Sequence, residues 1–162
     1  MKLSKRVIFL GLCLTTSAFA GQKVSTPPDI VVQALEHSQT DRMETIRMLE
    51  AALATASPSD RPILLIWTAE QYRLAKRENQ ARRLWEAALK ESKREEHRQC
   101  AQLGLALLTA PRSMDSLTRR HLEDLPANIG IPTQNADRYF LLSKLSLQQQ
   151  QSGRAQAYLK KA

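Results

Sequence analysis

Residues 65–89 have the sequence LIWTAEQYRLAKRENQARRLWEAAL, in which small and aromatic side chains recur at helical spacing. Ala69 and Tyr72 lie three residues apart, and Ala81 and Trp85 lie four apart. Separations of three and four place side chains on one face of an α-helix. Small residues let two helix backbones cross closely, and aromatic side chains fill the space between successive helices. The stretch therefore predicts two helices that pack against each other.

Counted from Pro62, small residues fill the eighth, twentieth and twenty-seventh positions, namely Ala69, Ala81 and Ala88. With the two aromatic residues, this pattern resembles the tetratricopeptide repeat, a pair of antiparallel helices about 34 residues long. The resemblance implies repeats that stack on their neighbours and present a curved surface to another molecule.

The rest of the chain divides into further helix pairs, and weaker units begin near Thr26, His97 and Ala136. Apolar spacing, proline breaks and capping residues predict helices that begin near residues 29, 41, 61, 80, 95, 114, 136 and 154. The third of these is expected to end near residue 78. Asp41 (or Thr40), Ser113 and Asn135 are the expected starting residues of three of them. We therefore expect an all-α fold over residues 29–162, a right-handed α-solenoid of three to four antiparallel helix pairs.

Residues 1–20 have the organisation of a cleaved secretory signal. Three basic residues precede an apolar run over residues 7–14, and Ala18-Phe19-Ala20 has the A-x-A form of a cleavage site. The run is far shorter than the ~20 residues that a membrane-spanning helix needs. We expect export to a bacterial periplasm or beyond, with residues 21–28 as a flexible lead-in. An uncleaved membrane anchor is the alternative.

The composition indicates one domain that is stabilised by apolar packing. The chain has 162 residues and a formal net charge of +8, and removal of the leader with its three basic residues leaves +5. This moderate excess favours contact with acidic proteins, anionic glycans or phospholipid headgroups without requiring it. Once the leader is removed, Cys100 is the only cysteine, so no internal disulfide forms. Basic residues alternate with acidic ones at helical spacings, which indicates a solvated face and argues against nucleic-acid binding. No stretch after the leader is apolar for long enough to span a membrane.

Two groups of residues are candidates for catalysis or metal binding. His97 and Cys100 lie on one helix face, but two ligands are too few for a metal site and packing is the favoured interpretation. His121, followed by Glu123 and Asp124, is best explained as a solvated helix end. We therefore expect neither an enzyme nor a cofactor or metal site.

In the tetratricopeptide family, the first helix of each pair lines the concave groove. The resemblance then implies peptide contacts from Ile66, Glu70, Arg73, Arg98, Phe140 and Lys144, with Ile63, Leu74, Ala101, Leu105 and Asp137 in neighbouring positions. The three basic side chains are expected to hold a carboxylate or an acidic peptide, and Ile66 and Phe140 to supply apolar contact. Ordinary contacts between helices are the alternative at all of these positions.

The predicted function is that of an exported adaptor, which binds a peptide or protein segment during assembly of a pilus, secretion or outer-membrane complex. One alternative is an accessory domain that binds cell-wall glycan or regulates a cell-wall enzyme, and another is a purely structural oligomer. The C-terminal helices are expected to leave an apolar face poorly covered, available to a partner or a second copy: Phe140, Leu141, Leu145, Leu147, Tyr158 and Leu159.

Overall fold

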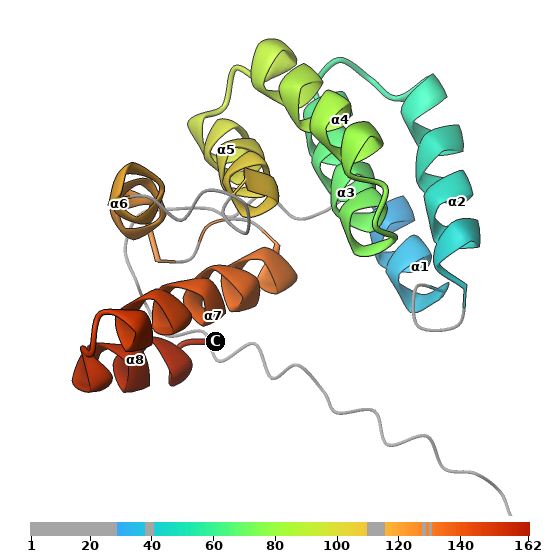
Figure 1. The fold of residues 1–162 in the computed structure, drawn as a ribbon. Coiled ribbons are helices and arrows are strands. Elements are labelled where there is room, and N and C mark those ends of the chain that lie inside the picture. The colour runs from blue at the N-terminus through green and yellow to red at the C-terminus, as the bar shows by residue number, and fades with distance from the viewer. Residues whose placement is uncertain (1–28, 38–40, 110–115, 128, 130) are drawn as a thin grey trace, which may run out of the picture.

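The computed structural model describes residues 29–37, 41–109, 116–127, 129 and 131–162. Within these ranges every regular element is an α-helix, so the predicted all-α class is confirmed (Figure 1). The expected signal (1–20) and lead-in (21–28) lie outside the described residues. In chain order the helices are α1 (Asp29–His37), α2 (Arg42–Thr55), α3 (Arg61–Leu74), α4 (Glu78–Glu91), α5 (Glu95–Thr109), α6 (Ser116–Asp124), α7 (Pro132–Gln148) and α8 (Ser152–Leu159).

None of the described helices is both long enough and apolar enough to cross a membrane.

The first turns of α2 and α3 follow from the residues predicted to start them. Asp41 caps α2, because its Oδ1 accepts hydrogen bonds from the N–H groups of Met43 and Glu44 at 2.9 and 3.1 Å. Pro62 lies in the first turn of α3, where its fixed φ suits the helix and its missing N–H costs no hydrogen bond. The two helices therefore begin where local chemistry favours a start.

The starts of α7 and α8 differ from the expectation. Helix α7 begins at Pro132, four residues before the expected start, because proline fits the first turn of a helix. Asn135, expected to cap this helix, lies inside it and donates from Nδ2 to the carbonyl of Ile129 at 2.7 Å. Helix α8 begins at Ser152 and includes Gly153, which was expected to precede it. The expected capping residue Ser113 lies outside the described residues.

The helix pairs α3–α4 and α7–α8 turn through the same backbone geometry. Lys76 (φ 62°) and Gln150 (φ 58°) both have the left-handed conformation just after the first helix of their pair. In each turn the next N–H donates to a carbonyl in the last turn of that helix, from Arg77 to Tyr72 at 2.9 Å and from Gln151 to Ser146 at 2.8 Å. These are bonds of the Schellman motif, which usually contains glycine. Because lysine gives no such signal, the predicted end of the third helix near residue 78 is wrong.

The helices pack mainly against their neighbours in sequence (Figure 1). Helix α5 contacts both α3 and α4, and α7 contacts both α5 and α6. A small apolar cluster joins the first three helices through Val31, Ala34, Leu49 and Leu64. A larger cluster extends from Ile46 of α2 to Leu145 of α7. The apolar core is thus drawn out along the order of the chain.

Small residues are buried where α3, α4 and α5 meet. Ala69, Ala81 and Ala88 have no exposed surface, which confirms that these small residues are in the core. The Trp85 indole is completely buried and lies against the backbone of α5 at Gly104. A Cβ atom added to Gly104 would be 2.2 Å from Cε2 of the indole. The helices therefore approach closely because the residues between them are small.

A buried arginine joins α6 to α7. Arg138 donates to backbone carbonyls at the C-terminal end of α6 and just beyond it, to Leu122 at 2.7 Å, Leu125 at 2.5 Å and Pro126 at 2.8 Å. Carbonyls at a helix C-terminus lack partners within the helix, and the helix dipole there favours a cation. Burial lowers the pKa of Arg138. The side chain thus satisfies carbonyls that its neighbour leaves open.

Polar and aromatic side chains also attach α8. The rings of Tyr139 and Tyr158 stack with their centroids 6.4 Å apart. The Tyr158 hydroxyl donates to Oε1 of Glu123 at 3.0 Å, and Nε of Arg119 donates to the same oxygen at 3.0 Å. Burial acts to raise the pKa of Glu123, but these two hydrogen bonds outweigh it and hold the pKa below its usual value. Long side chains therefore join α6, α7 and α8.

Candidate functional site

The six residues expected to contact a ligand lie in two kinds of environment. Ile66 and Glu70 of α3 have no exposed surface. Ile66 belongs to the larger apolar cluster, and the hydroxyl of Thr133, in the first turn of α7, donates to Oε1 of Glu70 at 2.6 Å. Neither side chain is accessible to a bound segment in this arrangement, because other parts of the chain cover both.

The expected carboxylate site at Arg73 is filled by carboxylates of the chain itself. Nε and Nη2 of Arg73 donate to the two carboxylate oxygens of Glu70 at 3.0 and 2.8 Å. Nη2 also lies 2.6 Å from Oδ2 of Asp137 on α7. Burial acts to lower the pKa of Arg73, but the bond and charge of Glu70, together with Asp137, raise it. The guanidinium group is thus engaged within the molecule and ties α3 to α7.

The other three expected contact residues are exposed. Arg98 on α5 has its Nε 3.7 Å from a carboxylate oxygen of Glu95 and donates weakly to the carbonyl of Leu89 at 3.4 Å. Phe140 and Lys144 lie one turn apart on α7. Within the described part of the chain, Lys144 makes no hydrogen bond or ion pair. The structure therefore places Arg98 beside the C-terminal end of α4 and brings Phe140 and Lys144 together on one accessible stripe.

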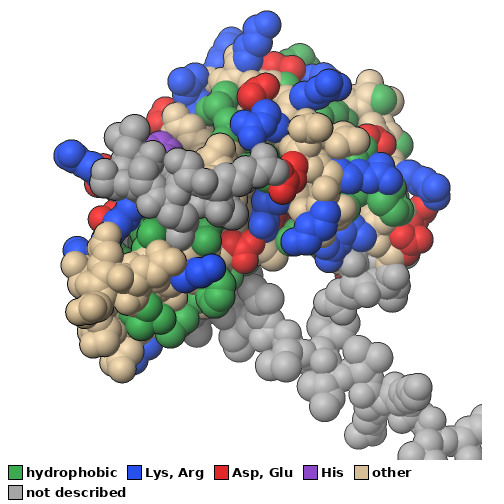
Figure 2. All heavy atoms as spheres, in the orientation of Figure 1, with side chains coloured by type: hydrophobic (Ala, Val, Ile, Leu, Met, Phe, Trp, Pro, Cys, Tyr) green, Lys and Arg blue, Asp and Glu red, His purple; other side chains and the backbone are tan. Residues whose placement is uncertain are grey.

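An apolar surface with a basic centre lies on α7 and α8, and we call it the end surface: Phe140, Lys144, Leu147 and Leu159. Its three apolar side chains are 57%, 57% and 49% exposed. They are three of the four large apolar side chains exposed in the described ranges. Figure 2 shows hydrophobic side chains gathered over this part of the molecule.

The apolar face expected at the C-terminal helices is only partly uncovered. Leu145 is buried, and Leu141 and Tyr158 are half-buried. The residues expected at this face therefore divide between core and surface, and the end surface is what stays open.

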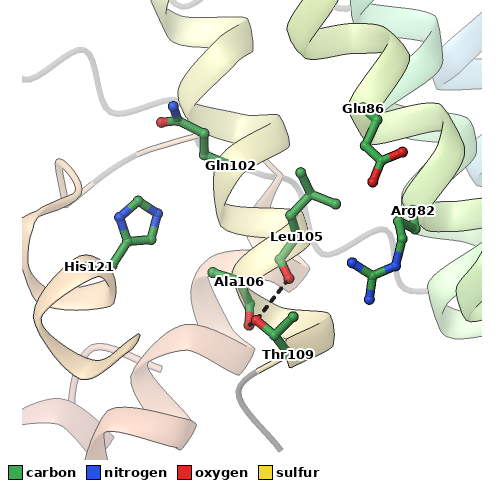
Figure 3. Close-up of a pocket in the computed structure, with 7 residues that line it drawn as sticks. All are labelled: Arg82, Glu86, Gln102, Leu105, Ala106, Thr109 and His121. Atoms are coloured by element: carbon green, nitrogen blue, oxygen red, sulfur yellow. Dashed lines mark hydrogen bonds between the residues drawn. The ribbon is translucent and has the colours of Figure 1, made fainter. Parts of the chain in front are cut away.

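Sequence reasoning missed a hollow of about 510 Å³ between α4, α5 and α6. Figure 3 shows Arg82 and Glu86 on one side, His121 on the other, and residues of α5 between them. Within the described residues, the side chains of Arg82, Glu86, Gln102 and His121 form no hydrogen bond or ion pair. Arg82 has the chemistry to hold an anion at this place. The spacing of these residues along three helices carries no recognisable motif.

The groups weighed for catalysis and metal binding are placed as packing predicts. Cys100 is buried, and burial raises the pKa of its thiol to about 12. His97 is also buried, and burial lowers its pKa. Three or more potential metal ligands do not come together anywhere in the described ranges. At His97 and Cys100, packing is the interpretation that the burial supports.

These features define an all-α protein whose helices pack in chain order. In its described part, three of the four exposed large apolar side chains lie on the last two helices. No family model, curated protein or solved structure matches the chain.

Proposed function

We propose that this protein is an exported helical-repeat adaptor, a short right-handed α-solenoid of the tetratricopeptide type, which binds a segment of a partner protein. Three observations support the repeat interpretation: neighbouring helices pack in chain order, two helix pairs share one turn geometry, and small residues are buried between α3, α4 and α5. Stacked repeats commonly present binding surfaces of this kind.

The end surface is the observation that carries the binding role. Contiguous apolar side chains in water mark interaction sites, and Lys144 adds a charge that selects among partners. In contrast, α3 offers a ligand little, because Ile66 and Glu70 are buried and Arg73 already holds two carboxylates. The proposed contact residues are therefore Phe140, Lys144, Leu147 and Leu159.

Export is proposed from residues 1–20, in which basic residues, an apolar run and an A-x-A sequence follow in the order of a secretory signal. An exported adaptor without a catalytic group is suited to assembly of a cell-envelope complex. Glycan binding has less support. Among the described aromatic side chains Phe140 is exposed, whereas Trp67 and Tyr158 are half-buried, so no pair of fully exposed rings is present to enclose a sugar.

Site-specific photo-crosslinking tests the adaptor role. A photoreactive benzoylphenylalanine replaces Phe140 in the full chain, which is expressed in its source cell and irradiated. We expect a discrete adduct with a partner protein, and we expect Lys144→Glu in the same chain to weaken that adduct. The control carries the photoreactive residue at Val32, an exposed apolar position on α1. Absence of an adduct, or the same adducts from both positions, would contradict the adaptor role.

A further inference from the structure

The two similar helix pairs can be aligned residue by residue on their shared turn. Setting Lys76 against Gln150 places Ala81 against Ala155. Both alanines are buried, and their N–H groups donate to the carbonyls of equivalent residues at 3.1 and 3.0 Å. The alignment is therefore one of structure as well as sequence position.

This alignment pairs the whole end surface with a covered surface of α3–α4. The pairs are Phe140 with Ile66, Lys144 with Glu70, Leu147 with Arg73, and Leu159 with Trp85. Every member on α7–α8 is exposed. Of the members on α3–α4, three are completely buried, and the side chain of Arg73 is 16% exposed.

Contacts from α7 account for part of this difference, at Glu70 and Arg73. Helix α5 accounts for another part. It packs on both α3 and α4, and its Gly104 lies under the indole of Trp85. Leu159 takes the place of Trp85 in α7–α8, yet it is about half exposed. Leu159 therefore marks the place on α7–α8 where a helix equivalent to α5 would rest.

We infer that the end surface receives one amphipathic helix of a partner protein, in the position that α5 occupies on α3–α4. This rests on the proposed adaptor function and specifies how the partner binds. A small residue of that helix lies over Leu159, as Gly104 lies against Trp85. Apolar residues of the helix cover Phe140 and Leu147, since helix-in-groove recognition uses side chains spaced one turn apart.

Charge indicates that the partner helix is acidic. Asp137 is the only acidic residue on α7–α8, and it is already engaged by Arg73. The exposed charges on and just after this pair are cations: Lys144, Arg154, Lys160 and Lys161. An acidic side chain facing Lys144 would form an ion pair at the centre of an apolar contact. A basic helix would be repelled.

A second copy of the chain is a poorer occupant of the end surface. Its own α5 is buried against α3 and α4, with Gly104 under Trp85, and is not available to another molecule. The occupant is thus a helix that is free in its own protein or folds on binding.

Peptide binding tests the inference with a probe taken from the chain. The probe is a fluorescent peptide with the sequence of residues 95–109, in which Cys100→Ser prevents oxidation and Arg98→Gln leaves Glu95 and Glu96 as an acidic end. It is titrated with the full chain and followed by anisotropy. We expect saturable binding, and we expect Leu159→Glu and Lys144→Glu each to weaken it at least tenfold. The matched chain control is Val32→Glu, which is expected to leave the affinity unchanged.

A second peptide distinguishes specific helix docking from nonspecific hydrophobic binding. It carries Gly104→Leu, and the side chain of the new leucine would occupy the space into which Leu159 should pack. We therefore expect this peptide to bind at least tenfold more weakly than the first. The three side chains replaced in the chain variants and their control, Leu159, Lys144 and Val32, are exposed. Unchanged far-ultraviolet circular dichroism verifies that each variant folds.

Three results would overturn the inference. The first is absence of saturable binding by the first peptide, and the second is equal binding of both peptides. The third is sedimentation of the chain alone as a dimer that Phe140→Glu abolishes. A partner adduct at position 140 without peptide binding would reject the helix mode and leave the adaptor role intact. Loss of the adduct as well would reject both.

Discussion

Two regions of this protein hold similar helix pairs in place through different kinds of side-chain contact. Helices α3, α4 and α5 meet through small residues and one buried indole, so their backbones approach closely. Helices α6, α7 and α8 also share buried apolar residues such as Leu122 and Leu142, but long polar side chains add to their attachment, chiefly Arg138, Glu123 and Tyr158. Close apolar packing needs complementary shapes on both helices, whereas a long side chain spans a gap. The second region can therefore keep an open face beside its attachments.

This difference has a functional consequence. The face of α3–α4 that carries Trp85 is closed by α5, while the equivalent face of α7–α8 carries Leu159 and is open. A region held by polar side chains at its flanks keeps its apolar surface available to a partner. The following four predictions test the comparison, in decreasing order of expected effect.

Trp85→Ala should be the most destabilising of these changes. It removes a completely buried indole from the junction of α4 and α5 and leaves a cavity. Truncation of a buried tryptophan or phenylalanine costs about 3–5 kcal/mol. Urea denaturation measures the free energy of unfolding. A loss below about 1 kcal/mol would show that the junction does not depend on this side chain.

Arg138→Met should lower the free energy of unfolding by about 2–3 kcal/mol, because carbonyls at the end of α6 lose their donor. The control is Arg154→Met on α8, where the side chain is exposed and should contribute little. Both are measured by urea denaturation. Equal effects of the two variants would contradict the role given to Arg138.

Gly104→Ala should destabilise by about 1–3 kcal/mol, because the new methyl group would overlap the rigid indole of Trp85. The matched change Gly153→Ala in α8 meets open space and should stabilise by about 0.5–1 kcal/mol. In a Trp85→Ala background, the cost of Gly104→Ala should largely disappear. Thermal and urea denaturation of the four variants test this, and an unchanged cost in that background would exclude the clash.

Glu123 should make stability depend on acidic pH. Its folded pKa is held below the unfolded value of about 4.3, so its contribution is complete above that value and is lost as the pH falls through the folded pKa. Glu123→Gln should therefore flatten the curve of unfolding free energy against pH below about pH 5. The control is Asp124→Asn, an exposed neighbour whose replacement should leave the curve unchanged.

The sequence predicts the first region better than the second. The spacing of alanines and aromatics specifies a close helix crossing, and Ala69, Ala81 and Trp85 are buried as this requires. Arg138 gave no such signal, because its partners are backbone carbonyls at the end of another helix. The turn at Lys76 was missed for a similar reason, since the sequence around a lysine in the left-handed conformation has no recognisable turn signal.

The sequence also predicts some contacts of the candidate site better than others. Register along one helix places Phe140 and Lys144 on one stripe, but it could not indicate that α7 would supply a carboxylate for Arg73. That contact depends on how two distant helices cross. Equally, the sequence pattern alone does not distinguish a position covered by the next helix, such as Ile66, from its open equivalent Phe140.

Amide hydrogen exchange tests most directly whether the two regions are held differently. We predict that amides in α4 and α5 exchange most slowly, that those in α7 and α8 open at a lower free energy, and that Arg138→Met accelerates exchange in α6–α8 while leaving α4 and α5 unchanged. Equal protection across both regions, with Arg138→Met accelerating all helices alike, would contradict the account.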